Sequence, residues 1–216
     1  MKTNRIGSLL IILLVGSTSM PGCGKNPTRG QSNGELTVKT VKNPDQTITT
    51  IFYRGGNEVA QQIRGKNDVI IETRGAIPDG IAREYYQSGK LMEEVPYLNG
   101  KQEGKSTWYY ETGVVKGERN YRAGKLDGII KWYYTTGSLG TEFNYKNGKL
   151  EGLTRLYWEN GNLKAEDYYE NGRREGRKTL YYNSGELRFV YTYKNGKKIN
   201  RKEYSKTGYL LATEEY

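Results

Sequence analysis

Carboxylates recur along this chain at an interval of 24 residues, and they are the side chains best placed for chemistry. They form two series: Glu103, Asp127, Glu151 and Glu175, and Glu94, Glu118, Glu142 and Glu166. Two carboxyl groups at a suitable separation can hydrolyse a glycoside. Catalysis needs one environment that shifts one pKa, however, whereas a series repeated in every unit offers several equivalent ones. We therefore expect ion pairs with the cations that follow at the turns, Lys101, Lys125, Lys149, Arg173 and Lys197.

The composition removes most other catalytic and metal-binding side chains. The chain of 216 residues has no histidine and a single cysteine, Cys23. This excludes Ser/His/Asp and Cys/His nucleophilic systems and most zinc sites. No glycine-rich turn opens a predicted helix, so a phosphate-binding loop is not indicated. We predict a protein that is not an enzyme and that has no catalytic residue, cofactor or metal site.

Tyrosine is the other residue type that recurs in register, and it offers a surface for binding. Our candidate binding face consists of Tyr85, Tyr109, Tyr133, Tyr157 and Tyr181, with the basic neighbours Arg83, Lys131 and Arg155. Tyrosine supplies a large contact area at low entropy cost, and cations attract anionic or sugar-bearing ligands. The alternative is that cross-strand tyrosine pairs only stabilise a thin sheet, at roughly 0.2–1 kcal/mol each.

Glycines on the same interval define the elements that must position these side chains. Gly80, Gly104, Gly128, Gly152 and Gly176 are each 24 residues apart. Fixed-period similarity indicates stacked supersecondary units. Each unit contains two short segments rich in β-forming residues, one turn with glycine between them and one Asn-Gly turn after them. Each unit is therefore predicted to be a β-hairpin.

Residues two apart in a strand share a face, which separates two aromatic columns. We expect an outward column, Tyr109, Tyr133 and Tyr157, opposite a packed column, Tyr110, Tyr134 and Trp158.

The unit resembles a known repeat. The acidic residue before glycine, the paired aromatics and the segments Tyr145–Lys149 and Tyr193–Lys197 are similar to the bacterial variant of the MORN repeat, found in proteins named after the YwqK antitoxin family. The resemblance covers roughly residues 75–216. It implies an all-β fold, an elongated single-layer antiparallel sheet of stacked 24-residue hairpins, and it implies little about activity.

The first residues are typical of an export signal. Lys2 and Arg5 precede an apolar run from Ile6 to Val15, which is shorter than the ~20 residues that span a bilayer. The segment Ser19–Cys23 resembles a lipobox, in which cleavage leaves a lipidated cysteine at the new N-terminus. We predict a lipoprotein modified at Cys23 and anchored to the membrane at the cell envelope, on the outer membrane or periplasmic face if the host has two membranes. An ordinary secreted protein and a cytoplasmic one are the alternatives.

These observations divide the chain into five parts. We predict a signal peptide over 1–22, the lipidated cysteine and a flexible tether over 23–35, a degenerate N-terminal β cap over 36–75, five MORN-variant repeats over 76–199 and a C-terminal capping repeat over 200–216. In that last unit Asn200 replaces the expected glycine, and Tyr204 comes one residue early.

The net charge points to acidic partners. It is +10 for the whole chain and +8 once Lys2 and Arg5 leave with the signal peptide. Such a balance favours anionic lipid, an anionic cell-wall polymer or an acidic protein as partner. Nucleic acid also fits the charge, but an exported chain rarely meets it. The alternative is that the lysines keep an exposed sheet soluble and blunt its edges.

The function that we predict is a binding or scaffolding module at the cell envelope. The first alternative is an antitoxin or immunity protein that neutralises a toxin, which the family's name suggests. The second is an enzyme that acts on envelope glycans, which would need one carboxylate pair with unequal environments in a cleft.

Overall fold

The computed structural model describes residues 34–66 and 69–216, which fold into 20 β-strands. The predicted signal peptide, Cys23 and most of the predicted tether lie outside the described residues. Four strands precede the repeats: β1 (Leu36–Lys42), β2 (Ile48–Arg54), β3 (Asn57–Arg64) and β4 (Ile70–Gly75).

Each repeat then contributes two long strands and, before the next repeat, one short strand. The first strands are β5 (Gly80–Tyr85), β8 (Gly104–Tyr109), β11 (Gly128–Tyr133), β14 (Gly152–Tyr157) and β17 (Gly176–Tyr181). The second strands are β6 (Leu91–Leu98), β9 (Val115–Arg122), β12 (Leu139–Lys146), β15 (Leu163–Glu170) and β18 (Leu187–Lys194). The short strands are β7 (Lys101–Gln102), β10 (Lys125–Leu126), β13 (Lys149–Leu150) and β16 (Arg173–Arg174), and the chain ends with β19 (Lys197–Tyr204) and β20 (Leu210–Glu215).

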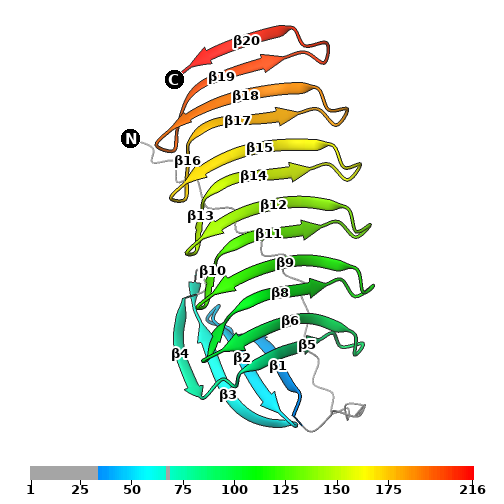
Figure 1. The fold of residues 1–216 in the computed structure, drawn as a ribbon, viewed down its shortest axis with the longest axis vertical. Coiled ribbons are helices and arrows are strands. Elements are labelled where there is room, and N and C mark those ends of the chain that lie inside the picture. The colour runs from blue at the N-terminus through cyan, green and yellow to red at the C-terminus, as the bar shows by residue number, and fades with distance from the viewer. Residues whose placement is uncertain (1–33, 67–68) are drawn as a thin grey trace. The chain divides into compact units, whose positions relative to one another are not determined.

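The hairpins stack in chain order into one open sheet, as Figure 1 shows for β5 to β20. Across the sheet the long strands follow the order β4, β3, β2, β1, β5, β6, β8, β9, β11, β12, β14, β15, β17, β18, β19 and β20. The predicted all-β sheet of stacked hairpins is confirmed. It is mixed rather than purely antiparallel, because β1 pairs with β5 in parallel.

Two kinds of turn hold each hairpin. At the Asn-Gly turns both residues have positive φ, as at Asn147 (+50°) and Gly148 (+80°), which is the conformation of a tight type I′ hairpin turn. At the other end of the hairpin Gly137 has a φ of +86°, and the Tyr134 amide donates to Ser138 O. A register shift lies directly beside this turn, between Trp132 and Tyr133 in the β11–β12 pair.

The glycines of the 24-residue series begin the first strand of each repeat, directly after the break that separates it from the strand before. They have φ values from +69° at Gly176 to +133° at Gly80, a region that favours residues without a Cβ. The last unit has Ile199 and Asn200 at the corresponding positions. There β19 runs unbroken for 8 residues and pairs with β18 along its length.

The main apolar core lies at the N-terminal end of the sheet. It contains Leu36, Phe52, Ala60, Ile77, Ala82, Val95 and Tyr97. The rings of Phe52 on β2 and Tyr97 on β6 meet edge to face with centroids 5.2 Å apart. In a flat sheet two intervening strands would separate β2 from β6 by roughly 14 Å. The sheet therefore curls here, and Figure 1 shows β1 to β4 turned across the end of the stack.

Beyond that core the sheet is a single layer with few buried side chains. Among apolar residues outside the core cluster, Tyr121, Ile130 and Ala165 are buried. Both faces of the remaining repeats are lined mainly by half-buried side chains, so contacts between neighbouring strands must provide most of the stability. The exact limits of the predicted cap segments stay predictions.

Deleting one whole unit tests whether the repeats stack independently. Removal of residues 128–151 takes out one hairpin in phase and should leave a shorter, folded sheet with a lower melting temperature. Removal of residues 128–138 takes out β11 and the turn that follows it, which would reverse every later strand, and should leave the chain largely unfolded. Circular dichroism and thermal melts of both variants check this. Equal damage from the two deletions would contradict it.

Candidate functional site

The candidate binding face is assembled as the alternation of side chains predicts. Its tyrosines end the first strands of the five repeats, and Arg83, Lys131 and Arg155 lie two residues earlier on the same face. Tyr85 has an exposed fraction of 40%, and the other four tyrosines are half-buried. The structure therefore brings these eight side chains to one face, one group per repeat.

The cations of this face are already paired with a glutamate of their own repeat. Arg83 Nε lies 2.8 Å from Glu94 Oε1, and Arg155 Nε lies 2.8 Å from Glu166 Oε2. Lys131 and Glu142 are 3.5 Å apart. In the second repeat the ion pair is between Lys105 and Glu118, with Lys105 Nζ 2.7 Å from Glu118 Oε1. These pairs neutralise most of the charge that the face was expected to present.

The tyrosine hydroxyls reach the same glutamates from the following repeat. Tyr133 donates to Glu118 Oε2 at 3.2 Å, and Tyr157 donates to Glu142 Oε2 at 3.2 Å. Tyr85 has no preceding repeat and donates to Glu35 Oε1 at 2.7 Å instead. Burial and that hydrogen bond to a carboxylate raise the pKa of Tyr85 to about 12. This face thus uses its polar groups to join one repeat to the next, and ligand binding by it stays a prediction.

The second aromatic column joins repeats in the opposite direction. Tyr86, Tyr110 and Tyr134 donate their hydroxyls to the main-chain carbonyls of Tyr109, Tyr133 and Tyr157, at 2.6, 2.8 and 2.8 Å. Tyr110, Tyr134 and Trp158 are half-buried, as Tyr109, Tyr133 and Tyr157 are. The expected contrast between a packed and an outward column is therefore not seen, because both columns make contacts between repeats.

The acidic residues before the glycines have partners other than the predicted ones. Their carboxylates accept main-chain amides 20 residues further on, at the residue of positive φ in the Asn-Gly turn or its equivalent. The pairs are Asp79 with Asn99, Glu103 with Ala123, Asp127 with Asn147, Glu151 with Asn171 and Glu175 with Asn195. The ion pairs expected with the turn cations were a wrong prediction, because these carboxylates accept the turn amides and none of them pairs with the five cations within residues 34–66 and 69–216.

A row of cations is left without carboxylate partners. Lys101, Lys125, Lys149, Arg173 and Lys197 are all exposed and form no ion pair with any residue of the described chain. We call these five residues the turn row. They begin β7, β10, β13, β16 and β19, and Figure 1 shows β10, β13 and β16 along one side of the sheet. The sequence contained this signal as a 24-residue series of Lys or Arg, which follows Asn-Gly in four units and Ala123-Gly124 in one.

One carboxylate pair has the unequal environments that an enzyme would require. Glu84 and Glu93 are cross-strand neighbours on β5 and β6. Glu84 accepts both the amide and the hydroxyl of Thr40 on β1, and Ser106 Oγ donates to Glu93 at 3.2 Å. Burial, opposed by Arg119 and reinforced by Glu84, raises the pKa of Glu93 to about 7. The bonds to Thr40 tie this pair to the junction with β1, so we interpret it as structural.

Within the described residues, no group of three or more His, Cys, Asp or Glu side chains is placed to hold a metal ion. The same part of the chain contains no helix long and apolar enough to cross a membrane.

Stacked hairpins, tied by tyrosines and acids that recur every 24 residues, define a β-hairpin repeat protein. Comparison with known families gives the same class: the MORN repeat variant matches residues 78–99, 102–123, 126–147, 150–171 and 174–195. These five segments make up half of the chain, and the chain belongs to this family. MORN repeats are generally binding repeats without catalytic activity. No curated protein matches the chain.

Removal of one tyrosine hydroxyl should weaken the contact between two repeats. Tyr134→Phe leaves the Tyr157 carbonyl without its donor and should lower the free energy of unfolding by about 1 kcal/mol. Tyr209→Phe is the control, because Tyr209 is 74% exposed and no hydroxyl bond is seen for it within residues 34–66 and 69–216. Urea denaturation compares the two. A loss of the same size in both variants would argue against the hydroxyl contact.

The raised pKa of Glu93 predicts a pH dependence of stability. Because the folded carboxyl has a pKa of about 7 against 4.5 in the unfolded chain, the folded state loses stability as pH rises from about 4.5 through 7. Glu93→Gln imitates the protonated carboxyl and should remove this loss. The free energy of unfolding of the wild type, relative to that of Glu93→Gln, should be lower at pH 8 than at pH 5. A constant difference between them would contradict the prediction.

Proposed function

We propose that this chain is an exported bacterial lipoprotein that acts as a binding and scaffolding module at the cell envelope, and that its turn row holds the sheet against an anionic surface. The single observation that carries the proposal is the turn row itself: one exposed cation per repeat, on the same side of every repeat, with no ion pair to a carboxylate of the described residues. Fixed positive charges in a line attract anionic lipid headgroups or an anionic polymer.

The spacing of the row is set by main-chain contacts between repeats. Gly124 N donates to Gln102 O at 2.9 Å, and Gly148 N donates to Leu126 O at 2.7 Å, so each Asn-Gly turn rests on the previous short strand. One repeat adds two strands, which places neighbouring cations roughly 10 Å apart. That distance is close to the Debye length at physiological salt, so each cation acts almost independently of the next. A longer row should therefore bind more tightly in nearly equal steps.

The N-terminal sequence supports an anchor that works together with the row. A lipobox cysteine receives a diacylglyceryl group, whose two acyl chains would attach the N-terminus to the membrane, and the turn row would then hold the sheet against the surface. Cys23 would provide the lipid and the turn row the charge. The predicted tether, 23–35, would let the sheet reach the surface beside its anchor. A lipobox leader is a bacterial signal, so this proposal takes the host to be a bacterium.

The experiment separates the two attachments. Cys23→Ala should move the protein from the membrane fraction to the soluble fraction, because the lipid is lost. On that background, Lys125→Gln, Lys149→Gln and Arg173→Gln together should weaken binding to phosphatidylglycerol vesicles. At about 1 kcal/mol per cation at low salt, the expected loss is up to about 100-fold. Vesicle co-sedimentation at two salt concentrations measures it, and both affinity and salt dependence should fall.

A matched variant removes the same charge from the candidate binding face, which we also call the tyrosine face. Arg83→Gln, Lys131→Gln and Arg155→Gln together should reduce vesicle binding much less, because these cations are already paired. Thermal melts check that each triple variant is folded. If vesicle binding falls more in this variant than in the turn-row variant, the proposed role of the turn row is wrong and the tyrosine face is the binding surface. Membrane retention by Cys23→Ala that resists a salt wash would overturn the anchor.

A further inference from the structure

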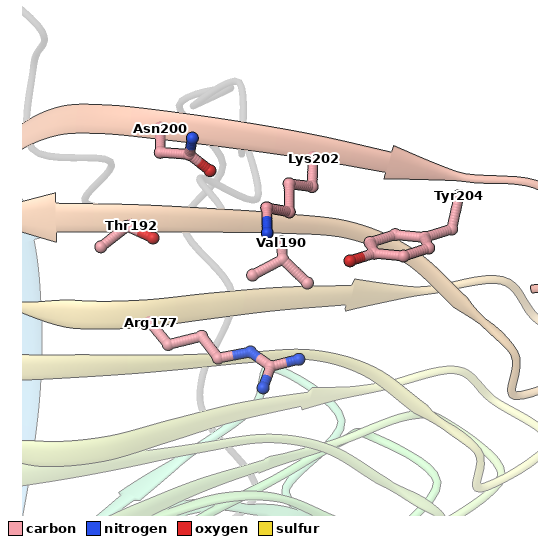
Figure 2. Close-up of a pocket in the computed structure, with 6 residues that line it drawn as sticks. All are labelled: Arg177, Val190, Thr192, Asn200, Lys202 and Tyr204. Carbon is pink, nitrogen blue, oxygen red and sulfur yellow. The ribbon is translucent and has the colours of Figure 1, made fainter. Parts of the chain in front are cut away.

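A polar hollow lies on the tyrosine face near the C-terminal end of the sheet. Its volume is about 410 Å³, and its lining comes from β17, β18 and β19: Arg177, Val190, Thr192, Asn200, Lys202 and Tyr204. Strand pairing places these side chains in two rows, with Arg177 beside Thr192 and Thr192 beside Asn200, and with Val190 beside Lys202. Figure 2 shows the Lys202 ammonium group and the Tyr204 hydroxyl turned toward Val190.

The second repeat shows what normally fills this position. There Glu118 stands on the second strand, 72 residues before Val190, and three groups of neighbouring strands surround it. Lys105 Nζ lies 2.7 Å from Glu118 Oε1, Lys131 is its cross-strand partner, and the Tyr133 hydroxyl donates to Oε2 at 3.2 Å. Lys105, Tyr133 and Lys131 together lower the pKa of Glu118, as expected for a carboxylate held by cations and a hydroxyl.

The last units repeat every partner of that carboxylate and omit the carboxylate itself. Arg177 occupies the position of Lys105, and Lys202 is the cross-strand partner of Val190 as Lys131 is of Glu118. Tyr204 is the equivalent of Tyr133. The Tyr182 hydroxyl donates to the Tyr204 carbonyl, and the Tyr110 hydroxyl donates to the Tyr133 carbonyl in the same way. Only the glutamate is replaced, by Val190.

The two cations of the hollow consequently have no internal counter-ion. Neither Arg177 nor Lys202 forms an ion pair with a carboxylate in residues 34–66 or 69–216. Both are exposed, whereas Val190, Thr192, Asn200 and Tyr204 are half-buried. The hollow thus brings the Arg177 guanidinium, the Lys202 ammonium and the Tyr204 phenol together around Val190. Three such donors form a site for an oxyanion from another molecule.

We propose that this hollow binds a carboxylate of a partner protein, the side chain of a Glu or Asp residue in an acidic segment, in the position that Glu118 occupies in the second repeat. A carboxylate is favoured over other anions because the equivalent neighbours in the earlier repeats already hold one. The half-open polar walls formed by Thr192 and Asn200 can accept main-chain groups of such a segment. This site is separate from the turn row, since it lies on the face of the sheet.

A blocked tetraglutamate peptide is the probe, titrated into the ¹⁵N-labelled protein at constant ionic strength. The peptide should shift the amide signals of residues 177, 190 and 202. Val190→Glu supplies the missing carboxylate internally and should weaken peptide binding at least tenfold without lowering the melting temperature. The matched control is Ile129→Glu, which makes the same change in charge at an exposed position of an earlier repeat, and it should bind almost as the wild type does.

The reverse substitution should create a second site. Glu118→Val leaves Lys105 and Tyr133 without their carboxylate, whereas Lys131 keeps its pair with Glu142. The peptide should then shift the amide signal of residue 105 as well. Equal affinity of the wild type and Val190→Glu would overturn the proposal, whether or not Glu118→Val folds. Tighter binding of inorganic phosphate than of the peptide at the same ionic strength would overturn the assignment to a carboxylate.

Discussion

The hydroxyl of the second tyrosine in a repeat donates to a main-chain carbonyl of the next repeat, and the stability of the sheet depends on contacts of this kind. A single layer has no opposing layer against which to bury its side chains, so neighbouring repeats must hold one another. Tyr110 and Tyr134 reach forward, whereas Tyr133 and Tyr157 reach back to glutamates. Each repeat is consequently fixed from both sides without a continuous apolar core.

This arrangement assigns the charged residues to two different tasks. On the tyrosine face, cations such as Arg155 are balanced by a glutamate and serve cohesion. Along the Asn-Gly side, the carboxylates accept hydrogen bonds from turn amides instead of forming ion pairs with the lysines, as Asp127 does from Asn147 N. The five cations of the turn row thereby recur in line on one side of the sheet without ion-pair partners among the described residues, which the net charge alone would not indicate.

The 24-residue glycine series was enough to predict the hairpins, their turns and the composition of the tyrosine face, because turn chemistry and strand alternation are local properties. Three features could not be predicted in this way. The parallel pairing of β1 with β5 and the contact between Phe52 and Tyr97 join segments with no shared periodicity. Asp127 accepts a hydrogen bond from the Asn147 amide instead of pairing with a lysine, and this depends on the path of the main chain through the turn. The role of Val190 emerges only when strand register shows which groups surround it.

The turn row also has a consequence for how such a protein can change. Because each repeat contacts mainly its immediate neighbours, an in-frame duplication of 24 codons would insert one more hairpin and, with it, one more surface cation in line with the others. The hollow beside Val190 would not be copied unless the last units themselves were duplicated. Copy number could therefore tune adhesion to a charged surface gradually, while recognition of a single acidic group stayed fixed at one per chain.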